Sequence, residues 1–338
     1  EAMLYTGGYR IYTSIDQEKQ QLLQASIDEN LKNYTEVSDE GYYTLQSSAT
    51  CIDNSSGRVV AIVGGRSQDN VEGFSLNRAF QSYRQPGSSI KPLIVYTPAL
   101  ERGYTADSIV SDTPIKDEKD APKNSGNSYS GRITLRKAVE KSRNVVAWRI
   151  FKEITPQVGL SYLKEMHYAK IMDSDYVLAA AVGGFTYGSN TMEMASGFGT
   201  LANEGEYREP TCIVSITDSN GDIVVSDEVE SSKVYDRNAA LEMVDILKGV
   251  LRYGTGAGLA IKNNMPCAGK TGTTDDNKDG WFCGFTKYYT TSVWVGYDTP
   301  RSMPGLFGGT YPGRIWKTYM DQIHEGLAVS DWDKYETD

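Results

Sequence analysis

The chain has 338 residues, 39% of them apolar and 23% charged, a composition typical of a globular protein of one or two domains. Its 34 Lys and Arg against 44 Asp and Glu give a net charge of −10, which disfavours a nucleic-acid-binding surface or a basic membrane-surface helix. With two His and four Cys but no Cys-x-x-Cys pair, we expect neither a structural zinc site nor a His-based triad. The longest apolar run, residues 177–185, is too short to cross a bilayer.

The N-terminal part begins without a strong pattern, so we interpret residues 1–12 as a linker from a missing N-terminal region. No signal peptide begins at Glu1, which indicates a processed chain or a part cut from a longer one. Apolar residues at helical spacing predict a helix over residues 15–31. Residues 50–64 predict two strands joined by an Asn-Ser-Ser-Gly turn, followed by a Ser/Gly/Asn-rich loop to about Gly87.

The middle of the chain changes to helical patterns separated by loops rich in Asp, Pro, Gly and Ser. The predicted helices there span residues 90–100, 135–152, 159–166 and 192–203. Strand patterns then return, with two more helices among them. The predicted strands are residues 212–217, 222–225, 281–286 and 291–297, and the predicted helices are residues 237–251 and 315–327.

This order of strands, helical block and strands favours an α+β fold, in which a helical subdomain is inserted into a sheet layer and a cleft lies between them. We therefore predict one domain over residues 13–330. Its sheet subdomain is expected at about 13–87 and 205–330, its helical subdomain at about 88–204, and a tail at 331–338.

Ser88 and Lys91 form a Ser-x-x-Lys pair, which on a helix puts the hydroxyl and the amine on one face. A serine needs a base to act as a nucleophile, and a lysine can be that base where burial or a nearby cation lowers its pKa. Pro92 has no N–H to bond the carbonyl of Ser88, so we expect Ser88 at the very start of its helix. A second copy, Ser161 to Lys164, is interpreted as ordinary helix surface.

Two further motifs are weak when each is taken alone. Ser142 and Asn144 form a Ser-x-Asn pattern that also fits a polar turn or cap between two helices. Residues 270–273, Lys-Thr-Gly-Thr, combine a cation, two hydroxyls and a glycine that lets another backbone approach closely. Those are the parts of a carboxylate receptor, although an exposed strand end is the simpler interpretation of this motif by itself.

The order Ser-x-x-Lys, Ser-x-Asn, Lys-Thr-Gly is the motif set of the penicillin-binding proteins and serine β-lactamases. The first two motifs fall in the predicted helical block and the third in the predicted sheet, on opposite walls of the expected cleft. The chain resembles the transpeptidase domain of class A (bifunctional) penicillin-binding proteins over nearly its whole length. The segments that carry the resemblance are residues 7–16, 84–92, 135–147, 191–195, 268–281 and 293–296.

The resemblance implies an antiparallel five-stranded sheet flanked by helices, with an inserted all-helical subdomain. It also implies a glycosyltransferase domain and a membrane anchor in an N-terminal segment, and a location on the outer face of the bacterial cytoplasmic membrane. The implied partners are donor and acceptor peptidoglycan stem peptides and β-lactam antibiotics. It implies no cofactor, metal or nucleic acid.

The activity that the resemblance implies is that of a serine D,D-transpeptidase. Ser88 would attack the penultimate D-Ala carbonyl of a stem peptide ending in D-Ala-D-Ala, and Lys91 would take its proton. Lys270 across the cleft would keep Lys91 neutral. Ser142 would relay a proton to the leaving amine, and a β-lactam would acylate Ser88 in the same pocket.

The remaining roles concern substrate binding. The backbone N–H groups of Ser88 and Thr273 would form the oxyanion hole. Asn144 would hold a substrate amide and help to orient Lys91, while Lys270 and the two threonines would bind the terminal carboxylate. The substrate-binding residues that the resemblance implies are Asn144, Lys270, Thr271, Gly272 and Thr273.

Two departures from the β-lactamase pattern bear on the function. Arg143 stands where β-lactamases commonly carry Asp, and we expect it to alter the charge of the cleft. The sequence has no Glu-x-x-Leu-Asn stretch, which argues against rapid β-lactam hydrolysis. The alternatives are a D,D-carboxypeptidase and a non-catalytic β-lactam sensor domain. A Cys267–Cys283 disulfide is conceivable outside the cell, although we favour two small buried thiols.

Overall fold

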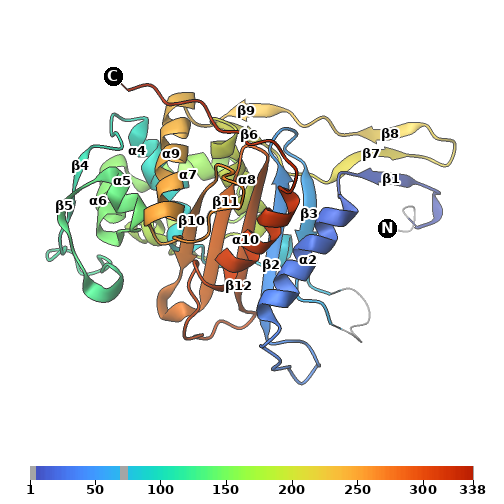
Figure 1. Cartoon of the computed structure of the whole chain (residues 1–338), viewed down its shortest axis with the longest axis horizontal. Helices are drawn as coiled ribbons and strands as arrows, with labels where there is room; N and C mark the ends of the chain where they lie inside the picture. Colours follow the sequence, from blue (N-terminus) through green and yellow to red (C-terminus); the bar gives the residue numbers. More distant parts are fainter. Residues whose placement is uncertain (1–4, 69–74, 338) are drawn as a thin grey trace.

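The computed structural model describes residues 5–68 and 75–337 (Figure 1). Positions 1–4 of the expected linker, 69–74 of the expected loop and 338 of the expected tail therefore lie outside the described residues. At the centre is the five-stranded antiparallel sheet that the resemblance implies. Its strands, in spatial order, are β10 (Ala268–Thr273), β11 (Asp279–Phe285), β12 (Tyr289–Tyr297), β2 (Leu45–Asp53) and β3 (Val59–Val63).

The sheet joins distant parts of the chain, because β12 pairs with β2 along nine residue pairs from Tyr289↔Asp53 to Tyr297↔Leu45. Both strands are almost wholly buried, since both faces of the sheet are covered by helices. Helices α2 (Gln17–Leu31) and α10 (Tyr311–Ile323) cover one face, and α8 (Thr191–Ala202) packs on the other (Figure 1). The edge strand β10 therefore faces the helical part of the molecule.

The helical part carries the nucleophile segment. We predicted one regular helix over residues 90–100, and the structure differs from this prediction. The segment is a 3₁₀ turn, η1 (Gly87–Ile90), then a π-helical turn, η2 (Pro92–Tyr96), then α4 (Thr97–Leu100). Pro92 has no N–H to donate, so the regular pattern breaks there, and the N–H of Thr97 bonds the carbonyl of Pro92 instead.

The predicted single helix over residues 135–152 is also wrong, because it is two helices, α5 (Leu135–Glu140) and α6 (Asn144–Ile154). Ser142 has φ +54° between them, a left-handed conformation that no α-helix continues through. The interpretation of Ser-x-Asn as a polar turn between two helices is confirmed. Helix α7 (Pro156–Glu165) follows, and the second Ser-x-x-Lys lies on it.

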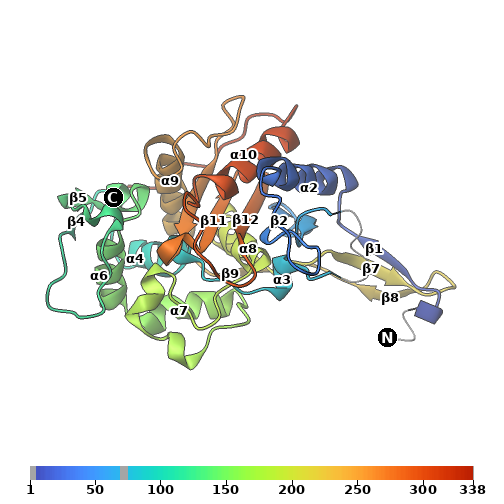
Figure 2. The same cartoon turned by 90° about the horizontal axis from the view of Figure 1, so that it is seen from below.

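A smaller three-stranded sheet extends away from the body of the molecule (Figure 2). It contains β1 (Arg10–Thr13), β7 (Ile213–Thr217) and β8 (Ile223–Ser226). Residues 10–12 are therefore not a plain linker, because β1 pairs with β7 in antiparallel register. The side chains of β8 are all exposed, so this sheet adds little to the core.

The remaining elements complete the frame around the cleft. Helix α9 (Arg237–Tyr253) packs against β10, and a short helix α3 (Arg78–Gln81) packs against α8. Two strand pairs lie outside the larger sheets: β4 (Ile109–Asp112) with β5 (Gly131–Thr134), and β6 (Glu206–Arg208) with β9 (Ser231–Lys233). In the segment expected as a tail, Trp332 is buried and its Nε1 donates to the carbonyl of Ala202 at 2.8 Å. Over the described residues, the helices are too short or too polar for a membrane span.

Candidate active site

The nucleophile candidate Ser88 lies in the first turn of η1, as its position before Pro92 predicted. The N–H groups of a first helical turn have no acceptor within the helix, so the Ser88 N–H is available to a ligand. Gly87, just before it, has φ +54°, and a Cβ there would lie 2.8 Å from the carbonyl oxygen of Thr273. The nucleophile turn and the end of β10 are therefore in direct backbone contact.

Two further glycines let backbone segments meet at this point. Gly183 has φ +89°, and a Cβ on it would lie 2.4 Å from backbone atoms of Gly87. A Cβ on Gly272 would lie 2.4 Å from the carbonyl oxygen of Pro86. A side chain at Gly272 would push the nucleophile turn away from β10, and a side chain at Gly183 would displace the same turn from the opposite contact.

Lys91 is fully buried directly behind the nucleophile turn. Its Nζ donates to Asn144 Oδ1 at 2.6 Å, to the carbonyl of Ser142 at 3.0 Å and to Ser142 Oγ at 3.5 Å. Burial, with the charge of Lys270 nearby, lowers the pKa of Lys91 well below its ordinary value. A neutral amine there can accept a proton.

Lys270, on strand β10 of the sheet, also contacts Ser142 and is fully buried. Its Nζ donates to Ser142 Oγ at 2.8 Å and to the carbonyl of Thr271 at 3.0 Å. Burial lowers the pKa of Lys270 to about 7. The left-handed backbone of Ser142 thus presents its hydroxyl to two lysines from different elements.

Asn144 connects the nucleophile to the base. Its Oδ1 accepts from Lys91 Nζ at 2.6 Å and from Ser88 Oγ at 3.5 Å, and its Nδ2 donates to the carbonyl of Lys123 at 2.9 Å. Ser88 and Lys91 therefore meet on one amide oxygen rather than bonding each other. One Nδ2 hydrogen of Asn144 is taken by Lys123, which leaves the other for the substrate amide expected there.

The Lys-Thr-Gly-Thr segment lies on the edge strand β10, which faces the nucleophile turn and is buried except at its end, Thr273, rather than being the exposed strand end that the motif alone suggested. Thr271 Oγ1 lies 2.6 Å from Thr255 Oγ1, and Thr273 Oγ1 accepts from the N–H of Gly308 at 3.1 Å. Each hydroxyl retains hydrogen-bonding capacity for a ligand, because each uses only one of its possible bonds here.

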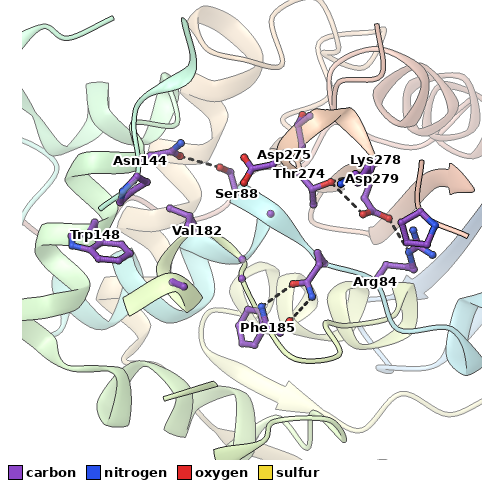
Figure 3. A pocket seen from close by; sticks show the side chains of 18 of the residues that line it. Arg84, Ser88, Asn144, Trp148, Val182, Phe185, Thr274, Asp275, Lys278 and Asp279 are labelled. Atoms are coloured by element: carbon purple, nitrogen blue, oxygen red, sulfur yellow. Dashed lines mark hydrogen bonds and ion pairs between the residues drawn. The ribbon is translucent and has the colours of Figure 1, made fainter. Parts of the chain in front are cut away.

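A cleft of about 820 Å³ opens in front of this assembly (Figure 3). Of the predicted residues, Ser88, Asn144 and Thr273 line it. Lys91 and Lys270 are fully buried behind them. The predicted residues that do not line this cleft are Lys91, Ser142, Lys270, Thr271 and Gly272.

Arg143, which we expected to alter the charge of the cleft, does not line it. Its Nε forms an ion pair with the buried Asp112 at 3.3 Å, and its guanidinium donates to the carbonyl of Ser128 and to Ser130 Oγ. These contacts fix both ends of the segment 112–130, which places Lys123 on the cleft wall.

A buried ion pair supports the opposite wall of the cleft. Arg84 Nε donates to Asp279 Oδ1 at 2.8 Å (Figure 3). Trp294 Nε1 donates to the same oxygen at 2.9 Å. Arg84 Nη1 also donates to the carbonyl of Asp298 at 2.8 Å. This network ties the start of the nucleophile segment to strands β11 and β12.

Sequence reasoning missed several residues of the site. The apolar side of the cleft is formed by Trp148 from α6 and by Val182 and Phe185 near η5 (Leu178–Val182), as Figure 3 shows. A signal was present for η5, since a Gly-Gly pair interrupts an apolar run there. Nothing in the sequence marks the pairing of Arg143 with Asp112, because the two residues are far apart in the chain.

The cysteines show no disulfide in the described part of the chain. Cys267 and Cys283 are both buried free thiols, which is the interpretation that we favoured. Cys283 Sγ lies 3.3 Å from Ser292 Oγ, and Cys267 Sγ accepts from the N–H of Ile261 at 3.5 Å.

The comparisons with known proteins agree with these observations. A family model of the penicillin binding protein transpeptidase domain matches residues 47–321. The chain is 33% identical to "Penicillin-binding protein 1A" of Clostridium acetobutylicum over 98% of this chain and 42% of that protein. It is 34% identical to "Penicillin-binding protein 4" of Bacillus subtilis over 93% of this chain and 48% of that protein. The chain thus spans less than half the length of either relative.

Solved structures share the fold. One is the PonA1 protein of Mycobacterium tuberculosis in complex with penicillin V, with a TM-score of 0.85 and 24% identity, covering 99% of this chain and 91% of that one. Another is Penicillin-Binding Protein 1A of Haemophilus influenzae, with a TM-score of 0.85 and 20% identity, covering 99% and 69%. Because the family model matches most of the chain and the fold agrees, the chain belongs to the penicillin-binding protein transpeptidase domain family.

Proposed function

We propose that this chain is a serine D,D-transpeptidase domain that cross-links peptidoglycan stem peptides through an acyl-enzyme on Ser88. The observation that carries the proposal is the hydrogen-bonded array that runs from Ser88 through Asn144 and Lys91 to Ser142 and Lys270. Over the described residues, both buried lysines donate to hydroxyl, amide and carbonyl oxygens and to no carboxylate, which is a costly arrangement that a purely structural core would not need.

Acylation begins with Ser88 Oγ attacking the carbonyl carbon of the penultimate D-Ala. Lys91 Nζ takes the hydroxyl proton, for which Ser88 Oγ moves from Asn144 Oδ1 to the amine. Catalytic hydrogen bonds commonly tighten only when substrate is bound. The carbonyl oxygen becomes an oxyanion, which the N–H groups of Ser88 and Thr273 stabilise by about 3 kcal/mol per donor.

The intermediate collapses when the terminal D-Ala leaves with its amine. Ser142 Oγ lies within reach of both lysines, so it gives its proton to the departing nitrogen and recovers one from Lys91. The carboxylate of the leaving D-Ala is held by Lys270, Thr271 and Thr273. An amine of a second stem peptide then attacks the Ser88 ester, releases Ser88 and forms the cross-link.

A β-lactam places a strained amide and a carboxylate in the same positions, so we propose that it acylates Ser88. The fold neighbour described in complex with penicillin V supports this proposal. The named relatives are more than twice as long as the part of them that this chain matches. We further propose that a glycosyltransferase domain and a membrane anchor precede this domain in the full protein, on the outer face of the cytoplasmic membrane.

The test uses a donor peptide ending in D-Ala-D-Ala, with and without an amine acceptor peptide, followed by mass spectrometry of the products. A transpeptidase gives free D-Ala and a cross-linked product that needs the acceptor. Free D-Ala with only hydrolysed donor would identify a carboxypeptidase, and neither product would favour a sensor. Ser88→Ala should abolish both products. Ser161→Ala, in the second Ser-x-x-Lys copy, is the matched control.

A further inference from the structure

Asp275 is a charged residue of the catalytic cleft to which the proposed mechanism gives no role. It begins the short turn η6 (Asp275–Asn277), two residues after the Lys-Thr-Gly-Thr segment ends. Its side chain is exposed and lines the cleft together with Ser88 and Thr273. In Figure 3 it points into the cleft, on the side of Ser88. A donor bound at Ser88 therefore occupies the same cleft as this carboxylate.

Two of the three cations that line the cleft are already paired with other carboxylates. Arg84 Nε lies 2.8 Å from Asp279 Oδ1, and Lys278 Nζ lies 3.2 Å from Asp276 Oδ2. Neither ion pair includes Asp275. Among the described residues, Asp275 thus adds a negative charge to its wall of the cleft that no neighbouring cation offsets.

The other charges near the cleft do not cancel this one. Lys123 and Asp120 line the opposite wall, and their charges have opposite sign. Lys91 and Lys270 are buried behind the cleft. In the proposed function one of these two lysines is neutral, and the charge of the other binds the carboxylate of the donor. Asp275 is therefore the charge that remains for another part of the donor.

The order of residues along β10 shows which part of the donor this is. In the proposed function the donor carboxylate lies at Lys270 and Thr271, and the carbonyl oxygen lies at the N–H of Thr273. Because these residues follow one another along an extended strand, the donor lies alongside β10. The acyl side of the donor then continues beyond Thr273 towards Asp275, which lines the cleft next to it.

We propose that Asp275 is a specificity-determining residue, which favours acyl donors that carry a positive charge on the acyl side of the scissile bond. This inference rests on the proposed function and deepens it by naming the charge that the cleft prefers in a donor. Because Asp275 is exposed, the preference is modest and weakens with salt. A charge at the rim of a site acts mainly on the association of the ligand, so the preference affects the second-order rate constant of acylation.

The test uses three penicillins that share one nucleus and one phenylacetyl side chain but differ in a single substituent on that side chain. Ampicillin carries an amine, benzylpenicillin a hydrogen and carbenicillin a carboxylate at this carbon. Acylation is followed at about pH 6, where an α-amine is protonated. Each rate constant is divided by that of benzylpenicillin for the same variant, which removes any effect of the substitution on the site as a whole.

The quantity compared between variants is the ratio of the ampicillin rate to the carbenicillin rate, because the intrinsic reactivities of the drugs then cancel. We expect this ratio to fall by about tenfold in Asp275→Asn, about threefold from each drug. Asp275→Lys reverses the charge and should lower the ratio by about tenfold more. A purely structural role would not place the parent, Asp275→Asn and Asp275→Lys in this graded order. The second variant also keeps the test decisive if the first fails to fold.

A distant control separates a local charge from the net charge of the chain. Asp222→Asn removes one exposed carboxylate from the turn before β8, in the sheet that extends away from the body of the molecule, and should leave the ratio unchanged. Raising the salt from about 0.05 M to about 0.5 M should bring the parent ratio closer to that of Asp275→Asn. A ratio that is equal in the parent and Asp275→Asn, or that falls equally in Asp222→Asn, would overturn the inference.

The proposed function is tested separately by benzylpenicillin, whose side chain has no charged group. If benzylpenicillin acylates the parent chain but the charge of the side chain makes no difference, only the role of Asp275 fails. If benzylpenicillin does not acylate the parent chain, the proposed function fails first.

Discussion

Lys91 and Lys270 approach the same serine from two different elements, and both are fully buried. Lys270 Nζ donates to Ser142 Oγ at 2.8 Å, and Lys91 Nζ lies 3.0 Å from the carbonyl oxygen of Ser142. Two protonated amines that both contact Ser142 would repel each other strongly in the low-polarity interior of the protein. The site therefore favours one neutral and one charged lysine, which are the forms that a base and a carboxylate receptor need.

The pH dependence of acylation should reflect these two lysines. The rate rises as Lys91 loses its proton, and it falls when Lys270 loses the charge that binds the carboxylate, near its pKa of about 7. The second-order rate constant for benzylpenicillin acylation should therefore follow a bell-shaped curve. The arginine in Lys270→Arg stays charged across the whole curve, so the rate of this variant should show no descending limb below about pH 9. Lys164→Arg, on the surface of α7, is the control, and a descending limb unchanged in Lys270→Arg would contradict the assignment.

Asn144→Asp tests the link between the nucleophile and the base. A carboxylate 2.6 Å from Lys91 Nζ would stabilise the charged amine and raise its pKa, so the base would stay protonated at neutral pH. We expect acylation at pH 7 to fall by about 10²-fold and the ascending limb of the pH curve to move to higher pH. Stopped-flow measurements across pH would show this, with the exposed Asn33→Asp as the control. A uniformly lower rate with an unshifted limb would indicate a structural effect only.

Gly183→Ala should displace the nucleophile turn. The new Cβ would lie 2.4 Å from backbone atoms of Gly87, in a backbone conformation with φ +89°. Gly258 has φ +88° and open space around it, so Gly258→Ala carries the same backbone strain without the contact. We expect Gly183→Ala to be less stable than Gly258→Ala by about 1–3 kcal/mol in denaturant unfolding, and to acylate more slowly. Equal stability of the two variants would mean that the contact does not constrain the fold.

Arg143→Ala should slow acylation although Arg143 lies outside the cleft. Loss of its contacts with Asp112 and Ser130 frees the segment whose Lys123 carbonyl orients the Asn144 amide. A small displacement of Asn144 moves Lys91, and we expect the acylation rate to fall by about tenfold.

Two companion variants make the Arg143 experiment specific. Arg143→Lys keeps the charge and should restore part of the rate, although it lacks the planar fork. Arg132→Ala removes an exposed arginine from the adjoining strand β5 and should have no effect. If Arg143→Ala acylates at the parent rate, the contacts of Arg143 do not position the base.

The sequence predicted the order of elements well where apolar spacing was clear, as in α2, α8 and α9. It failed where a proline or a left-handed residue interrupts a helical pattern, at Pro92 and Ser142. Both interruptions lie at the site, where the chain gives up regular structure to direct a side chain. Apolar periodicity contains no information about such a break, because the residues on either side still face one core.

The chemistry of the site followed from three short motifs, but their surroundings did not. The four motif residues Ser88, Lys91, Ser142 and Lys270 are neighbours in the structure, as we predicted. This prediction depended on the fold that the resemblance implies, because the motifs are far apart in the chain. The contact of Thr271 with Thr255 and the ion pair of Arg143 with Asp112 depend on the paths of loops. No short-range pattern in the sequence indicates those paths. Loop geometry is set by long-range packing, which a single sequence does not display.

The most direct test of the central claim is the intact mass of the chain after incubation with benzylpenicillin, measured beside Ser88→Ala. We predict a gain of one penicillin mass on the parent chain and no gain on the variant, with the adduct on the peptide that contains Ser88. Ser89→Ala controls for the neighbouring hydroxyl, which is already bonded to the carbonyl of Pro86. A parent chain with unchanged mass and intact drug, or an adduct that persists in Ser88→Ala, would contradict the account.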